Sequence, residues 1–161
     1  NHKEDKIERQ QYLAKKIKPR TYIDDVKAVF ATEPAGIIIE MLTGMIEGNS
    51  SDDTWNGRVF AFVAAITPPL TYLRDRGCIQ LSPAIYSKYI EISEVETLLY
   101  EHDGKYGEDF ENVIKPLHNY ITLLPGYDAS RTNEGQSNQT IEQFGYITMQ
   151  LVKILNQLES A

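Results

Sequence analysis

The spacing of apolar side chains in residues 140–158 is the feature that most constrains what this chain can fold into. Apolar residues recur there every three or four positions along the whole segment. Side chains three and four positions apart share one face of an α-helix, so this spacing predicts a long helix with one buried side. The residues that carry the pattern are Ile141, Phe144, Ile147, Leu151, Ile154, Leu155 and Leu158.

The same periodicity recurs through most of the chain, whereas the alternation typical of strands is nearly absent. Residues 78–81 are the one short strand candidate. We therefore expect an all-α fold, a compact multi-helix bundle of about seven to nine helices that forms a single domain over residues 1–161. The predicted helices cover residues 4–17, 22–30, 35–46, 55–66 with a continuation to 75, 82–89, 93–101, 108–123 and 140–158.

Prolines and polar segments refine these boundaries. Proline lacks a backbone donor and clashes with the preceding turn, so Pro68-Pro69 predicts a kink or a fresh helix start, and so does Pro116. Ser93 and Glu96 have the spacing of a capping box that would open the helix over 93–101. Residues 125–139 are rich in Gly, Ser and Asn and are expected to form a long polar loop.

Charge is distributed unevenly along the sequence. The chain carries 23 acidic and 16 basic residues, a net charge of −7, and residues 81–161 hold 12 of the acidic residues but only 5 of the basic ones. An acidic segment of this kind would repel phosphate and suit a basic protein partner. The alternative is that its charges simply form a solvated surface. Residues 1–20, predicted to hold a basic N-terminal helix, have a net charge of +4. The nucleic-acid-binding candidates lie there: Lys15, Lys16, Lys18 and Arg20.

Motifs that would support catalysis or metal binding are not found. Cys78 is the only cysteine, no glycine-rich phosphate loop occurs, and no two of the three histidines are four positions apart. Three carboxylate pairs fall at predicted helix starts, where negative charge complements the helix dipole. No apolar stretch approaches the roughly 20 residues that span a bilayer. We expect no catalytic residue, no metal and no cofactor in this domain.

Binding candidates lie at the ends of predicted helices. Trp55 and Arg58 open a helix after an acidic loop, and both residue types are enriched in binding hot spots. The alternative is a buried Trp55 that seats the helix, with Arg58 paired to an acidic neighbour. Arg74 ends the same helical run, where positive charge is stabilising in any case. The remaining candidates for partner binding are the acidic residues Glu108, Asp109 and Glu111.

Three stretches, taken in order, carry a family resemblance. They are residues 54–58 together with 70–75, residues 120–127, and residues 143–150. In that order they resemble the all-alpha domain of coupling proteins from type IVB secretion and IncI-type conjugation systems, the DotL-like (IcmO-like) and TrbC-like family. The resemblance covers residues 54–158.

The resemblance implies a parent protein and a location. It implies that the chain is an insertion domain excised from a hexameric ATPase at the cytoplasmic face of the bacterial inner membrane. ATP and Mg are then expected in the parent's flanking domain, and membrane contact only through the parent. A start without Met and an amphipathic run that reaches the last residues agree with a segment of a longer protein.

The leading hypothesis is a non-enzymatic substrate-recognition domain. It would receive secreted effector proteins, or relaxosome proteins with their DNA, and would meet other secretion-system subunits while being a monomer in isolation. Two alternatives stay open: a helical DNA-binding module that uses the basic N-terminal residues and Arg58, and a structural spacer of the hexameric ring. The acidic second half favours recognition of a protein over direct gripping of DNA.

Overall fold

The structure, a computed structural model, describes residues 5–9, 22–50, 53–102 and 104–160. These residues form helices, turns and loops without a strand, which confirms the all-α prediction. Residues 5–9 are helical, and the other elements are α2 (Tyr22–Thr32), α3 (Ala35–Asn49), α4 (Asp53–Asp75), α5 (Pro83–Lys88), α6 (Ile92–Tyr100), α7 (Phe110–Thr122), the 3-10 helix η1 (Ala129–Arg131) and α8 (Asn138–Ser160).

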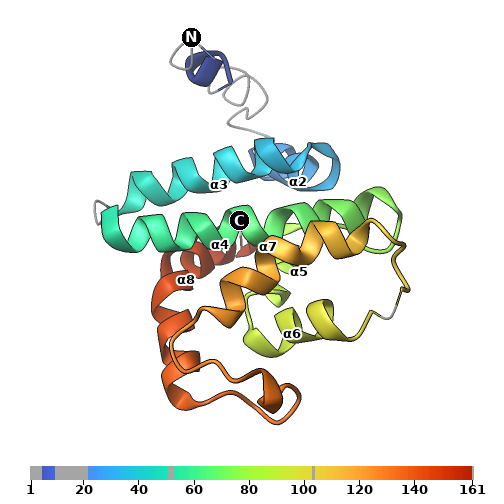
Figure 1. Ribbon diagram of the computed structural model, residues 1–161. Coiled ribbons are helices and arrows are strands. Elements are labelled where there is room, and N and C mark those ends of the chain that lie inside the picture. Colours follow the sequence, from blue (N-terminus) through green and yellow to red (C-terminus); the bar gives the residue numbers. More distant parts are fainter. Residues whose placement is uncertain (1–4, 10–21, 51–52, 103, 161) are drawn as a thin grey trace.

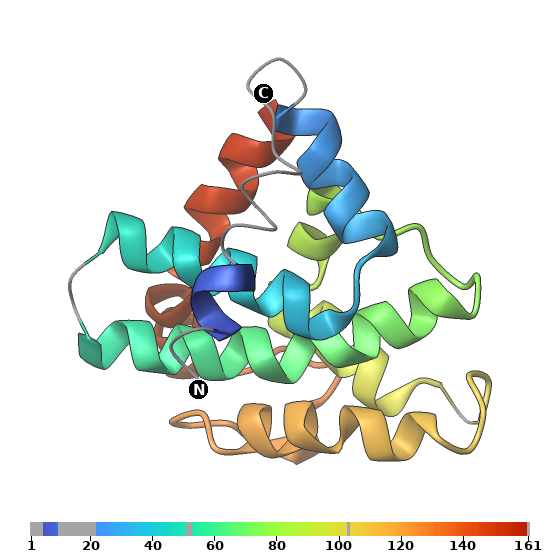
Figure 2. The same ribbon diagram turned by 90° about the horizontal axis from the view of Figure 1, so that it is seen from above.

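Helix α4 lies at the centre of the bundle. It packs against α3, α7 and α8, while α5 packs against α8. Helices α3 and α4 run side by side, and α8 runs across them rather than along them (Figures 1 and 2). Helix α6 lies on the side of α4 away from α3, close to the polar loop that leads into α8 (Figure 1).

One apolar core joins the helices. The ring of Phe62 on α4 lies 5.1 Å from that of Phe144 on α8 and 5.6 Å from that of Tyr120 on α7. Near the other end of α4, Phe30 of α2 meets the buried ring of Tyr86 of α5 edge to face. Each large side chain buried in this way contributes about 1.5–3 kcal/mol, so the core holds α4, α7 and α8 in a fixed relation.

The proline pair does not start a new helix, so that part of the prediction is wrong. Helix α4 continues through Pro68 and Pro69 to Asp75. Core side chains on both sides of the pair, such as Ile66 and Leu70, are fully buried, and their burial favours one continuous helix. The hydroxyl of Thr67 also donates to the carbonyl of Val63, next to the carbonyls of Ala64 and Ala65, which lose their backbone donors to the two prolines.

Pro116 likewise lies inside a single helix, α7, rather than at a restart. It lies on the exposed side of α7, between exposed Lys115 and buried Leu117. Water can therefore hydrate the carbonyl that loses its partner there, which makes the interruption tolerable.

Two further local predictions are wrong and one is confirmed. Residues 78–81 form a loop rather than a strand. Ser93 does not cap α6, because the helix begins one residue earlier, at Ile92, and Glu96 turns into the protein interior instead. The helix start predicted at residue 82 is confirmed, and the Ser82 hydroxyl caps α5 by accepting a hydrogen bond from the backbone N–H of Ile85.

The polar loop before α8 is fixed against the start of that helix. Gly126 has a φ of +77°, a conformation that other residues rarely adopt, so glycine is strongly preferred there. The hydroxyl of Thr140 donates to the carbonyl of Pro125 at 2.9 Å. This contact holds the polar loop against α8. The end of the loop, α6 and α8 together border a cavity.

Candidate functional site

Two exposed features distinguish the surface, and the first surrounds Trp55. The ring of Trp55 is 36% exposed on the first turn of α4, and the guanidinium carbon of Arg58 lies 4.6 Å from its centroid. Tyr146 and Met149 of α8, each 57% exposed, line a cavity of about 250 Å³ together with Trp55. We call these four residues the Trp55 surface.

The local fold turns Trp55 outward. The neighbouring Asn56 is buried, and its side-chain amide donates to the carbonyl of Ser50 at 2.9 Å, which ties the end of α3 to the start of α4. Val59, three positions further on, is buried in the core. Trp55 precedes Val59 by four positions, so it lies at the edge of this buried face, where it lines the cavity together with Asn56 and Val59.

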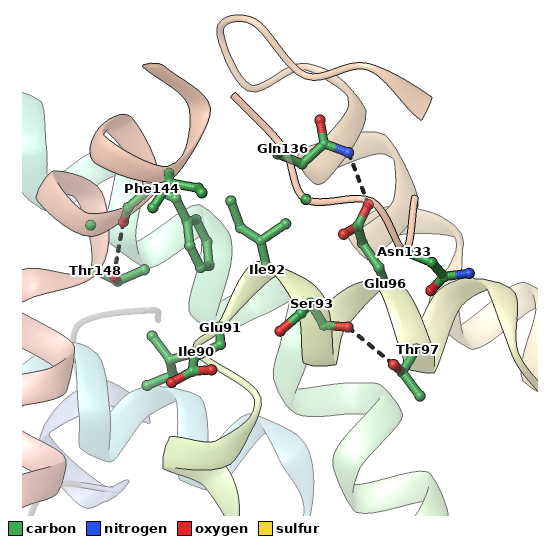
Figure 3. A pocket seen from close by; sticks show the side chains of 13 residues that line it. Ile90, Glu91, Ile92, Ser93, Glu96, Thr97, Asn133, Gln136, Phe144 and Thr148 are labelled. Atoms are coloured by element: carbon green, nitrogen blue, oxygen red, sulfur yellow. Dashed lines mark hydrogen bonds between the residues drawn. The ribbon is translucent and has the colours of Figure 1, made fainter. Parts of the chain in front are cut away.

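The second feature is a pocket between α6, the end of the polar loop and α8, which we call the α6–α8 pocket. Its volume is about 590 Å³. Its apolar floor includes Ile92 and Phe144, whose side chains face each other across it (Figure 3), and Ile141, 51% exposed, also lines it. The charged residues among its lining are Glu91 and Glu96, both acidic.

Glu96 joins α6 to the polar loop. Its side chain is buried, and its Oε2 accepts hydrogen bonds from the Tyr127 hydroxyl at 2.9 Å and the Gln136 amide at 3.0 Å. The Gln136 side chain also bonds both the N–H and the carbonyl of Asp128, which closes the loop on itself. Burial raises the pKa of the Tyr127 hydroxyl well above its ordinary value, and its neighbours Tyr100 and Glu96 raise it further, so Tyr127 stays a donor.

Trp55 and Arg58 are brought together as the sequence predicts, but Arg74 is not near them. The Arg74 side chain is only 7% exposed, and its Nη1 donates to the carbonyls of Phe30 and Glu33. It also pairs with Asp75. Its contacts give it a structural role, and no observation tests a partner-binding one.

The acidic candidates lie at the start of α7. Glu108 and Asp109 are exposed just before the helix, where negative charge complements the dipole as expected. Glu111, in the first turn, has its Oε1 3.3 Å from the Nε2 of buried His102. These residues are set apart from the lining of both cavities, and their role in binding stays a prediction.

The basic candidates Lys15, Lys16, Lys18 and Arg20 lie outside the described residues. Within the described ranges, no three His, Cys, Asp or Glu side chains gather closely enough to hold a metal ion. In that same part of the chain, no helix combines the length and apolarity needed to cross a bilayer.

Sequence reasoning missed the α6–α8 pocket and half of the Trp55 surface. Ile141 was expected in the core but lies at the first turn of α8, beyond the cover of neighbouring helices. Met149 and Tyr146 fall off the main apolar stripe of α8, and this offset was the available signal. No sequence pattern indicated that Glu96 lines the pocket, because its capping-box spacing predicted a partner at Ser93 instead.

Comparison with known proteins identifies a relative of this chain. The chain is similar to type 4 coupling protein DotL of Legionella pneumophila, with 37% identity over 120 residues. The match covers 69% of this chain but spans only 15% of the length of DotL. No protein-family description matches the chain, and neither does any solved structure. The similarity supports a relationship to type IV coupling proteins.

Proposed function

We propose that this chain is the all-α, substrate-recognition domain of a type IV coupling ATPase and that it recruits proteins for translocation. The relationship to DotL supports the parent protein. The Trp55 surface is the observation that carries the recognition role.

The Trp55 surface has the composition of a binding anchor. Trp, Tyr and Arg dominate the energetics of protein interfaces, and Met adapts to varied partners. Stacking of Arg58 on Trp55 holds both side chains in place before a partner arrives, which lowers the entropy lost on binding. An exposed aromatic group of this kind, bordering a cavity, suits a protein ligand better than a phosphate backbone.

In this proposal the domain itself is not an enzyme. ATP and Mg bind in the flanking domain of a hexameric parent, at the cytoplasmic face of the bacterial inner membrane, and the membrane is contacted only by the parent. If the 161-residue chain alone hydrolysed ATP, this assignment of roles would be wrong.

The test is the variant Trp55→Ala in the full-length coupling protein. We expect translocated substrate proteins to co-purify with the variant at least tenfold less, because truncating a hot-spot residue typically costs about 2 kcal/mol or more. Leu123→Ala is the matched control, since Leu123 is an apolar side chain that is 82% exposed outside the Trp55 surface. Equal recovery of substrates by Trp55→Ala and by the wild type would contradict the proposal.

The DNA-binding alternative has its own measurement, a titration against labelled single- and double-stranded DNA at two salt concentrations. Phosphate contacts release counterions, so real DNA binding weakens steeply with salt. Salt-sensitive binding that is lost on reversing the charges of Lys15, Lys16, Lys18 and Arg20 would favour that alternative. The spacer alternative instead predicts that no Trp55 surface variant changes the recovery of any partner.

A further inference from the structure

The α6–α8 pocket contains a buried carboxylate with spare acceptor capacity. Glu96 is only 3% exposed, and both of its hydrogen bonds go to Oε2. Among the described residues, none donates to Oε1, and no Lys or Arg pairs with this carboxylate. In Figure 3 the carboxylate of Glu96 points toward Gln136 from the helix that also carries Ile92, and both Glu96 and Ile92 line the pocket.

Oε1 of Glu96 is not among the buried polar atoms that lack a partner, so it stays open to the pocket, where a cation would gain a charge-assisted hydrogen bond. Tyr127 and Gln136 are neutral donors, so they orient Glu96 without cancelling its charge. Glu91, the other charged residue that lines the pocket, is exposed and also acidic. Lys88 at the end of α5 already pairs with Glu94, at 3.8 Å. The electrostatics of the pocket therefore favour a cation.

The rest of the lining favours an apolar group beside that cation. Ile92 and Phe144 form a floor, Ile141 stands half-exposed at the side, and the hydroxyl of Thr148 is already engaged by the Phe144 carbonyl at 2.8 Å. A volume of about 590 Å³ exceeds that of a single side chain and suits a short peptide segment.

We propose that the α6–α8 pocket binds a peptide segment of a protein partner in which a large apolar side chain is flanked by Lys or Arg. The apolar side chain packs on Phe144 and Ile141, and the cation bonds Oε1 of Glu96 with Glu91 nearby. This inference rests on the proposed role in recruiting proteins and adds the chemistry of the segment recognised.

The test measures fluorescence anisotropy of a short labelled peptide that has a central leucine pair between lysines, titrated with the 161-residue chain. We expect saturable binding, and at least tenfold weaker binding when glutamates replace the lysines or serines replace the leucines. Glu96→Gln keeps an acceptor for Tyr127 and Gln136 but removes the charge, and should weaken binding about tenfold. Glu101→Gln, an equal charge change at an exposed position just after α6, should leave binding unchanged.

Ile141→Ala provides a second variant that does not depend on a buried position. Ile141 is 51% exposed, so its truncation should spare the fold while weakening peptide binding several-fold. Met149→Ala, on the same helix but outside this pocket, is its control. Absence of binding, equal binding of the glutamate peptide, equal loss in the control variants, or equally tight binding of octylammonium would each overturn the proposal.

The two proposals fail separately. If the peptide does not bind but Trp55→Ala still abolishes substrate recovery in the full-length protein, the pocket inference falls and the proposed function stands. If the peptide binds and Trp55→Ala has no effect, the pocket holds a segment but the recognition role of the Trp55 surface is wrong.

Discussion

The guanidinium of Arg74 completes the end of a neighbouring helix. Helix α2 ends at Thr32, and the carbonyl of Phe30 would normally accept from the residue four positions later. That residue is Pro34, which has no N–H. Arg74 donates to this carbonyl at 2.9 Å and to that of Glu33 at 2.7 Å. A residue of α4 therefore supplies the hydrogen-bond donor that Pro34 lacks.

We expect Arg74→Met to lower the free energy of unfolding by about 2 kcal/mol, because two part-buried carbonyls lose a charged donor. Urea unfolding followed by circular dichroism measures the change. Arg76→Met is the control: its guanidinium stacks over the Tyr72 ring at 4.5 Å on an exposed surface, and its loss should cost under about 1 kcal/mol. Equal midpoints for the Arg74 variant and the wild type would show that Arg74 does not hold α2 and α4 together.

Helix α4 illustrates how burial overrides local propensity at the scale of an element. Proline in a helix interior costs roughly 3 kcal/mol relative to alanine, yet α4 passes through two prolines in succession. Pro69 is buried and packs in the core, whereas Pro68 is only half-buried. Packing of the Pro69 ring therefore offsets more of the cost of a proline in a helix than packing of the Pro68 ring does.

We expect Pro68→Ala to raise the free energy of unfolding by about 1–3 kcal/mol, since the new N–H can bond the carbonyl of Ala64. Pro69→Ala should gain less or nothing, because its buried ring leaves a cavity. Thermal unfolding of both variants measures the difference. A destabilised Pro68→Ala would mean instead that the packing of the half-buried Pro68 ring outweighs its backbone penalty.

The sequence was sufficient where one helix face alone decides the structure. The apolar stripe of α8 predicted that helix to within two residues at each end, and Ser82 predicted the start of α5. Failures occurred where a distant partner decides, as when Tyr127 and Gln136 hold Glu96 inside the fold. The pocket is built from three separate segments, so no local pattern could reveal it. Arg58 stacking on Trp55 was predictable because both lie on one turn.

At the scale of the whole molecule, several helices contribute tyrosines that resist ionisation. Burial raises the pKa of Tyr120 on α7 to about 12, although the nearby Arg58 opposes the shift. Burial also raises the pKa of Tyr86 on α5 far above its ordinary value, despite the hydrogen bond to Thr67. In the unfolded chain these hydroxyls titrate near pH 10, so above that pH the folded state holds protons that the unfolded state loses.

We therefore expect the buried tyrosines to contribute fully to the free energy of unfolding below about pH 10. That contribution should fall as the pH rises toward about 12. Urea midpoints measured between pH 8 and pH 11.5 would show a plateau and then a decline, and Tyr120→Phe should make that decline shallower. Tyr146→Phe removes the hydroxyl of a side chain that is 57% exposed and serves as the control. Tyr86 and Tyr120 lie on different helices of one core. At each pH, urea should therefore unfold the protein in a single cooperative transition. Two transitions, or a slope unchanged in Tyr120→Phe, would show that these tyrosines are not buried in one cooperative unit.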